Sequence, residues 1–169
     1  TGLFYHLFHR ASSRVSADTG FVIFMLVYTR QITVEWGESD PFGLVYFPRM
    51  LAWFNDAEHE FFAQAGYPVK EMIEKDRTAF VMGRIQFEFV GPAAYGDRIL
   101  TRLKLVDISN STLKWECTAN HLSGSLVTQG TATRVYAEIQ DNGELKAIAI
   151  PNRIREMLGA PTLDEASSG

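Results

Sequence analysis

The chain has 169 residues, enough for one domain and too few for two comfortable ones. Hydrophobic residues make up 46% and charged residues 21%, a balance that is typical of a folded domain and excludes a disordered chain. The net charge of -4 comes from interspersed acids and bases without a basic run, which argues against nucleic-acid binding.

We interpret residues 1–26 as an N-terminal extension that leads into the first strand. The apolar run Phe21–Tyr28 is shorter than the ~20 residues of a transmembrane helix, and no small-residue cleavage site follows it. We therefore predict a buried strand there and no membrane segment. From Tyr28 to Trp36 apolar and polar residues alternate, which predicts a half-buried strand whose apolar face is interrupted only by Arg30.

A long helix is predicted for Pro48–Ala65. Proline suits the first helical position, and Gly66 suits a left-handed cap at the end. Apolar residues recur at intervals of three and four around most of this helix, so it must be covered on several sides. A sheet wrapped around the helix provides that cover.

The rest of the chain, after a short helix near 69–75, is strand-like. We predict strands at 80–90, 97–108, 112–122, 126–139 and 145–150, a closing helix at 151–158, and a frayed tail at 159–169. This order predicts an α+β domain over residues 27–158, with an antiparallel sheet of five or six strands around a long central helix. Such a sheet leaves an edge to bury in a partner, so we expect at least a homodimer and favour a homotetramer.

The chemistry-bearing residues cluster just before the long helix. Asp40 precedes a proline and lies a few residues before the helix start, where unpaired N–H groups and the helix dipole favour negative charge. A carboxylate and an oxyanion-stabilising N–H on one short loop are the two parts that thioester hydrolysis needs. The same spacing also fits an ordinary turn in which Asp40 caps its own backbone.

The segment Val34–Pro48, with the sequence VEWGESDPFGLVYFP, resembles the signature of the 4-hydroxybenzoyl-CoA thioesterase family. PAAYGD at 92–97 and GTATRVY at 130–136 resemble that family's second turn and last long strand, and the resemblance covers about residues 27–158. It implies a hotdog fold and a thioesterase for aromatic or medium-chain acyl-CoA. No cofactor is expected, because coenzyme A is part of the substrate.

The resemblance assigns roles to residues around the loop. Asp40 matches the catalytic carboxylate, which either attacks the thioester carbonyl or activates a water. Phe47 matches the residue whose backbone N–H binds the thioester carbonyl. Tyr46 and Asn55 fall where the family lines its acyl pocket.

Two departures from the family bear on the substrate. The hydroxybenzoyl enzyme reads the aromatic hydroxyl with a tyrosine and an aspartate, where this chain has Phe47 and Asn55. Phe47 cannot hydrogen-bond a phenol, which relaxes that selectivity, whereas Asn55 can still bind a polar substituent. The family's nucleotide-binding basic cluster is also missing, and we expect Ser109 and Asn110, in that turn, to bind coenzyme A with hydroxyl and backbone donors.

Alternatives remain for the carboxylate and for the function. Glu58 shares a helix face with Asn55, and another hotdog branch uses a helix carboxylate as its acid, so Glu58 is a second site candidate. Otherwise it is a buried glutamate paired at the dimer interface. Alternative functions are a non-catalytic module binding acyl-CoA or acyl-carrier protein and, less favoured because no histidine flanks Asp40, a hydratase or dehydratase.

The single cysteine, Cys117, excludes an internal disulfide and favours a reducing compartment, so we expect the protein in the cytoplasm. Cys117 alternates with Trp115 and Ala119, which predicts a core position rather than a nucleophile. The histidines have no ligand spacing, and we expect no metal.

Overall fold

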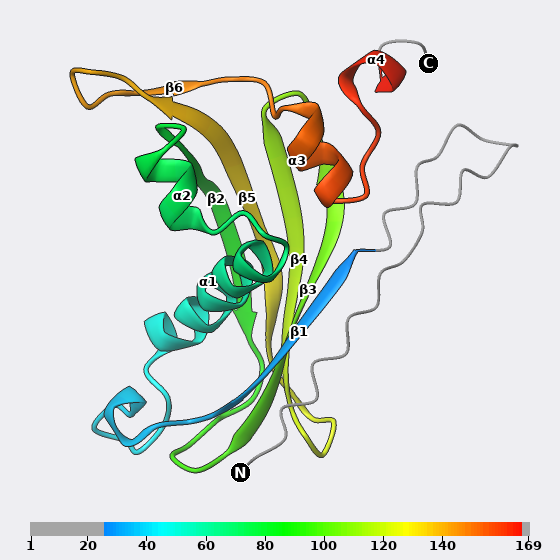
Figure 1. Ribbon diagram of the computed structural model, residues 1–169. Helices are drawn as coiled ribbons and strands as arrows, with labels where there is room; N and C mark the ends of the chain where they lie inside the picture. The colour runs from blue at the N-terminus through cyan, green and yellow to red at the C-terminus, as the bar shows by residue number, and fades with distance from the viewer. Residues whose placement is uncertain (1–25, 167–169) are drawn as a thin grey trace, which may run out of the picture.

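The computed structural model describes residues 26–166, which form a six-stranded antiparallel sheet with one long helix against it (Figure 1). The strand order is β1-β3-β4-β5-β2, and the short β6 pairs with β5. This confirms the predicted antiparallel sheet. The strands are β1 Val27–Thr33, β2 Thr78–Phe89, β3 Arg98–Ile108, β4 Thr112–His121, β5 Leu126–Ile139 and β6 Leu145–Ala147.

The long helix α1, Phe47–Gln64, lies in the curve of the sheet (Figure 1). It ends where predicted, since Gly66 has a φ of 87° that an L side chain rarely adopts. Burying each large apolar side chain stabilises the fold by about 1.5–3 kcal/mol. The buried residues of α1 are Met50, Trp53, Phe54, Ala57, Glu58, Phe61 and Phe62.

Strand β1 is shorter than its sequence pattern predicted. The chain leaves the strand before Trp36, which starts a 3-10 turn at Trp36–Glu38 and is 77% exposed rather than on the apolar face. The residues 21–25 of the predicted strand lie outside the described part. Arg30 interrupts the apolar face for a reason: it forms ion pairs with Asp56 and Glu60 of α1, at 3.8 and 2.9 Å.

A β-bulge in β2 changes which of its side chains face the helix. Met82 pairs with Arg134 of β5, but the register then shifts by one residue, and Gly83 is the extra residue. A Cβ on Gly83 would lie 2.9 Å from the side chain of Val135. Because of the bulge, Met82 and Ile85 lie on the same face of the strand although three residues separate them.

The remaining helices are α2 Val69–Glu74, α3 Asn152–Met157 and α4 Leu163–Ala166. The predicted fraying was wrong for residues 159–166, because Ala160 is buried and its N–H bonds to Arg155 O at 2.8 Å, and α4 follows. Strand β6 also ends at Ala147, three residues before the predicted end. No helix in the described part is long and apolar enough to cross a membrane.

Candidate active site

Asp40 sits in a tight turn that holds one of its carboxylate oxygens. Oδ1 accepts hydrogen bonds from the N–H groups of Phe42 and Leu44 at 2.8 and 3.1 Å, and the Asp40 N–H donates to Leu44 O at 2.6 Å. Gly43, with a φ of 79°, makes the turn possible. No described residue donates to Oδ2. One carboxylate oxygen therefore caps the turn, and the other has no donor among the described residues.

The turn is anchored on both sides by backbone hydrogen bonds. Tyr46 N–H donates to Glu38 O at 2.8 Å, and Val45 N–H donates to Ala93 O at 2.8 Å. Ala93 belongs to the 92–97 turn that resembles the family's second motif. That turn therefore holds the Asp40 loop in place through a backbone hydrogen bond.

The side chain of Glu38 ties the loop to α1, which the sequence analysis missed. Its carboxylate accepts hydrogen bonds from Glu35 N–H and from Trp53 Nε1, both at 2.7 Å. The signal was the Glu35-x-x-Glu38 spacing, which matches a capping box before a short helix. Glu38 thus takes a structural role and holds the loop against α1.

The start of α1 offers one free backbone donor. Phe47 is the first helical residue, Pro48 has no N–H, and Arg49 N–H donates to Tyr46 O at 2.8 Å. No described residue accepts a hydrogen bond from Phe47 N–H. The helix dipole adds partial positive charge at this position, so the N–H is suited to a developing oxyanion.

Exposed aromatic rings surround this donor. The ring of Phe47 lies 5.3 Å from that of Tyr46 and 5.7 Å from that of Phe89, edge to face in both cases. About half of each side chain is exposed. An apolar cluster of this kind in a folded chain marks a surface that a ligand or a second subunit covers.

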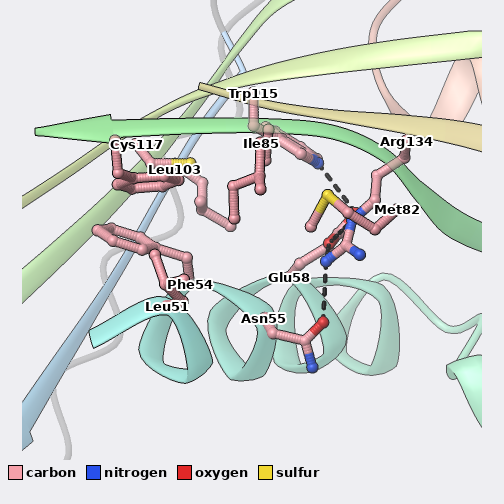
Figure 2. A pocket seen from close by; sticks show the side chains of 12 residues that line it. Leu51, Phe54, Asn55, Glu58, Met82, Ile85, Leu103, Trp115, Cys117 and Arg134 are labelled. Atoms are coloured by element: carbon pink, nitrogen blue, oxygen red, sulfur yellow. Dashed lines mark hydrogen bonds and ion pairs between the residues drawn. The ribbon is translucent and has the colours of Figure 1, made fainter. Parts of the chain in front are cut away.

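A small cavity lies further along α1, between the helix and the sheet (Figure 2). Its volume of about 20 Å³ holds about one water, so an acyl group enters only if side chains rotate. Met82, flexible and 43% exposed, has the most freedom to do so. The lining residues are Leu51, Phe54, Asn55, Glu58, Met82, Ile85, Phe87, Leu103, Trp115, Cys117, Ala132 and Arg134.

A buried polar network closes one end of this cavity (Figure 2). Glu58 and Arg134 form an ion pair with side chains only 4% and 8% exposed, and Arg134 Nε donates to Glu58 Oε2 at 2.7 Å. Trp115 Nε1 donates to the other oxygen of Glu58 at 3.0 Å. Arg134 Nη2 also donates to Asn55 Oδ1 at 2.9 Å. Sequence reasoning missed Arg134, because the network joins residues 76 positions apart.

This network changes the interpretation of Glu58. Both of its oxygens are held inside one chain, so the pairing predicted at a dimer interface occurs in the core instead. A carboxylate with this pairing is a poor candidate for a proton-transferring acid. Asn55 and Glu58 both line the cavity, whereas Tyr46, which the resemblance places in the acyl pocket with Asn55, is not among the lining residues and lies near Phe47.

The structure does not bring Ser109 and Asn110 to the Asp40 loop within one chain. They form the β3–β4 turn, and β3, which spans roughly 35 Å, begins beside the Asp40 end of the sheet. Ser109 Oγ accepts from Thr112 N–H at 3.0 Å, and Asn110 O accepts from Ile150 N–H at 2.8 Å. Within one chain this turn therefore lies at the opposite end of β3 from the Asp40 loop.

Cys117 is buried, as predicted, and burial raises the pKa of its thiol to about 12. A thiol of this kind is protonated at neutral pH and is a poor nucleophile. Within residues 26–166 no group of three or more histidine, cysteine or acidic side chains is placed to hold a metal ion.

Comparisons with known proteins identify the family and the fold. The model of the thioesterase-like superfamily matches residues 34–158. The chain is 22% identical over 124 residues to the acyl-CoA thioesterase YbgC of Haemophilus influenzae, covering 73% of this chain and 88% of the relative. It is 24% identical over 129 residues to the 4-hydroxybenzoyl-CoA thioesterase of Pseudomonas sp. strain CBS-3, covering 73% and 91%. A 1,4-dihydroxy-2-naphthoyl-CoA thioesterase from Synechocystis has the same fold, with a TM-score of 0.72, 19% identity, and coverage of 78% of this chain and 95% of that one.

Proposed function

The chain belongs to the thioesterase-like superfamily, and we propose that it hydrolyses an aromatic or medium-chain acyl-CoA thioester to the free acid and coenzyme A. It is a thioester hydrolase with the hotdog fold of its structural neighbours. The observation that carries the proposal is the pairing, on one loop and helix start, of a free carboxylate oxygen at Asp40 with a free N–H at Phe47.

In the proposed reaction the thioester carbonyl oxygen accepts a hydrogen bond from Phe47 N–H. The tetrahedral intermediate places negative charge on that oxygen, and the helix dipole stabilises it without reorganisation. When the intermediate collapses, the C–S bond breaks and coenzyme A leaves as the thiolate, which takes up a proton.

Two routes to the intermediate fit the free oxygen of Asp40. As a nucleophile, Oδ2 bonds to the carbonyl carbon, and water then hydrolyses the mixed anhydride. As a general base, Oδ2 accepts a proton from a water whose oxygen attacks the carbonyl carbon. In both routes the hydrogen bonds to Oδ1 from Phe42 and Leu44 fix the carboxylate while Oδ2 acts.

The aromatic surroundings support an aromatic or medium-chain acyl group. The rings of Phe47 and Phe89 lie 5.7 Å apart at the start of α1, and those of Phe54 and Phe87 lie 5.1 Å apart beside the inner cavity. An acyl group that passes from one pair to the other is removed from water along its length, which favours binding. Phe47 offers no hydroxyl to a phenol, so strict 4-hydroxybenzoyl selectivity is not part of the proposal.

The proposed enzyme acts as a homodimer at least, and we favour a homotetramer in the cytoplasm. Strand β2 lies at the edge of the five-strand path, and Met82, Ile85 and Phe89 on it are each at least 42% exposed. An exposed apolar edge strand is a template for pairing with a second copy. A second subunit would also bring another copy of the Ser109–Asn110 turn, which we propose binds coenzyme A.

The test is the release of coenzyme A thiol from a panel of acyl-CoA thioesters by wild type and Asp40→Asn. Asp40→Asn should retain less than about a tenth of wild-type kcat, which corresponds to at least ~1.4 kcal/mol of barrier. Asp107→Asn makes the same change at an exposed position of β3 and should behave like wild type. A wild-type protein that binds the panel without releasing thiol would identify a non-catalytic binding module instead.

A further inference from the structure

His121 is a histidine that the proposed reaction leaves unused. It is the last residue of β4, at the same end of the sheet as the Asp40 loop (Figure 1). The hairpin that follows holds its backbone, because its N–H donates to Ser125 O at 2.9 Å and its carbonyl accepts from Gly124 N–H at 2.8 Å. Its side chain is 24% exposed and extends from this fixed position.

The imidazole of His121 contacts the 92–97 turn. Nε2 lies 2.9 Å from Pro92 O, and Nδ1 lies 3.9 Å from Asp97 Oδ2. A backbone carbonyl can only accept, so Nε2 carries the hydrogen and donates it. At 3.9 Å Nδ1 is too far from Asp97 for a hydrogen bond, so the bond to Pro92 is the one that ties the ring to the turn.

The bond from His121 holds a part of the turn that the strands leave free. Just before the turn, Gly91 N–H donates to a carbonyl of β5 at 3.0 Å, and at its end the Asp97 carbonyl accepts from Val34 N–H at 2.9 Å. Pro92 has no N–H of its own. No other group in the described part donates to the Pro92 carbonyl. The orientation of the peptide that follows Pro92 therefore depends on the imidazole.

The same turn holds the Asp40 loop. Val45 N–H donates to Ala93 O at 2.8 Å, and Leu44 forms an antiparallel bridge with Ala94. Leu44 in turn holds Asp40, because its N–H donates to Oδ1 at 3.1 Å and its carbonyl accepts from the Asp40 N–H at 2.6 Å. A continuous path of hydrogen bonds and adjacent peptides thus connects the imidazole to the Asp40 carboxylate.

We propose that His121 is a positioning residue for the Asp40 carboxylate and acts through the 92–97 turn. The inference rests on the proposed thioesterase function and adds a residue of β4 to it. Loss of the imidazole bond lets the turn move, the peptides of Leu44 and Val45 move with it, and Oδ2 of Asp40 is displaced. A displacement of about 1 Å at reacting groups lowers a rate about 100-fold, so a small shift is sufficient.

The expected effect of losing His121 is on kcat rather than on KM. The residue does not line the acyl cavity, and it lies at the opposite end of β3 from the Ser109–Asn110 turn. A change that affects only the group acting in the transition state lowers kcat and kcat/KM equally and leaves KM unchanged.

Two substitutions separate a donor aimed at Pro92 from a side chain that is merely polar. In His121→Gln the amide nitrogen is as many bonds from the backbone as Nε2, so it can donate to Pro92 O. In His121→Asn the amide is one bond shorter and does not reach. With the acyl-CoA that wild type hydrolyses fastest, we expect His121→Asn to lower kcat about tenfold or more with KM within about twofold. We expect His121→Gln to keep about half of wild-type kcat or more.

The matched control is the neighbouring residue of β4. Asn120 Nδ2 donates to Gly124 O at 3.1 Å, so Asn120→Ala removes a side-chain bond from the same hairpin without touching the 92–97 turn. It should leave kcat and KM unchanged. A loss of activity in this control equal to that in His121→Asn would mean that the hairpin as a whole is responsible, and would overturn the positioning role.

Two further readouts test the path itself. In the Asp40→Asn background, His121→Asn should lower the residual thiol release by less than about twofold, because the group that it positions is already gone. A general weakening of the fold would lower both backgrounds alike. Amide hydrogen exchange at Leu44 and Val45 should be faster in His121→Asn than in wild type or His121→Gln, since their hydrogen bonds open more often.

The outcomes distinguish this inference from the proposed function. Wild-type kcat in His121→Asn, a His121→Gln variant no better than His121→Asn, or equal losses in both Asp40 backgrounds would overturn the positioning role and leave the thioesterase intact. Unchanged exchange at Leu44 and Val45 would overturn the path through the turn. A wild-type protein that hydrolyses no thioester would overturn the proposed function and, with it, the catalytic role of His121.

Discussion

Replacing Arg134 by Met should destabilise the fold strongly, because it leaves the carboxylate of Glu58 in the core without its counter-ion. The Glu58 side chain is 4% exposed and would keep only the Trp115 Nε1 donor. Removing one partner of a buried pair costs about 3–5 kcal/mol. For a chain of this length that corresponds to a fall in Tm of roughly 10 °C.

The double variant Glu58→Gln/Arg134→Met should recover much of this loss. It removes both charges, and the amide oxygen that the Glu58→Gln change introduces still accepts from Trp115. We expect the double variant to be more stable than Arg134→Met alone by about 2 kcal/mol, a coupling within the range of contacting residues. Arg102→Met makes the same change at an exposed position of β3, away from the β2 edge, and should alter stability by less than ~0.5 kcal/mol.

The assay is urea unfolding of five proteins, namely wild type, Arg134→Met, Glu58→Gln, the double variant and the control. All are measured at one fixed protein concentration, because association with a second subunit also contributes to stability. Two results would refute the reasoning. One is a cost below about 1 kcal/mol for Arg134→Met, which would mean that water reaches the pair. The other is a double variant less stable than either single variant, which would mean that the charges do not depend on each other.

Two further predictions concern the core and the sheet edge. Burial raises the pKa of the Cys117 thiol from 9.0 to about 12, so above pH 9 the unfolded chain loses this proton first and stability falls as the pH rises toward 12. The urea concentration at the midpoint of unfolding should therefore drop more for wild type than for Cys117→Ala between pH 8 and 10.5. Equal drops for the two proteins would contradict the burial argument. Sedimentation at micromolar concentration should give at least twice the chain mass of 19.0 kDa, whereas a single-chain mass would refute pairing through β2.

The elements of the fold were predictable where local pattern and tertiary packing agree. The helix α1 shows this, because a proline at its start, Gly66 at its end and apolar residues around most of its surface all predict the observed helix. The failures have local causes. Trp36 continues the alternation of β1 but lies beyond the end of the strand, where it starts a 3-10 turn that the Glu38 side chain caps. The bulge at Gly83 was not visible, since only the register with β5 reveals the extra residue.

The candidate site also has a part that the local sequence predicts and a part that only the fold reveals. The parts assigned to the reaction, Asp40 and Phe47, lie seven residues apart on one turn and helix start, so a single stretch of sequence predicts them. The residues of the buried polar network come from α1, β4 and β5, and Arg134 reaches Asn55 and Glu58 only because β5 runs over the helix. A polar residue such as Arg134 in a strand pattern looks like part of the solvent face.

The orientation of the Asn55 side chain depends on two other residues. Considered alone, an asparagine is a donor and an acceptor and is compatible with almost any polar partner. Arg134 Nη2 donates to the Asn55 oxygen, and Glu58 fixes that arrangement by holding the guanidinium. The orientation of the amide is therefore a property of three residues rather than of Asn55. A relative with the same asparagine but without the buried ion pair would not be expected to hold the amide in this orientation.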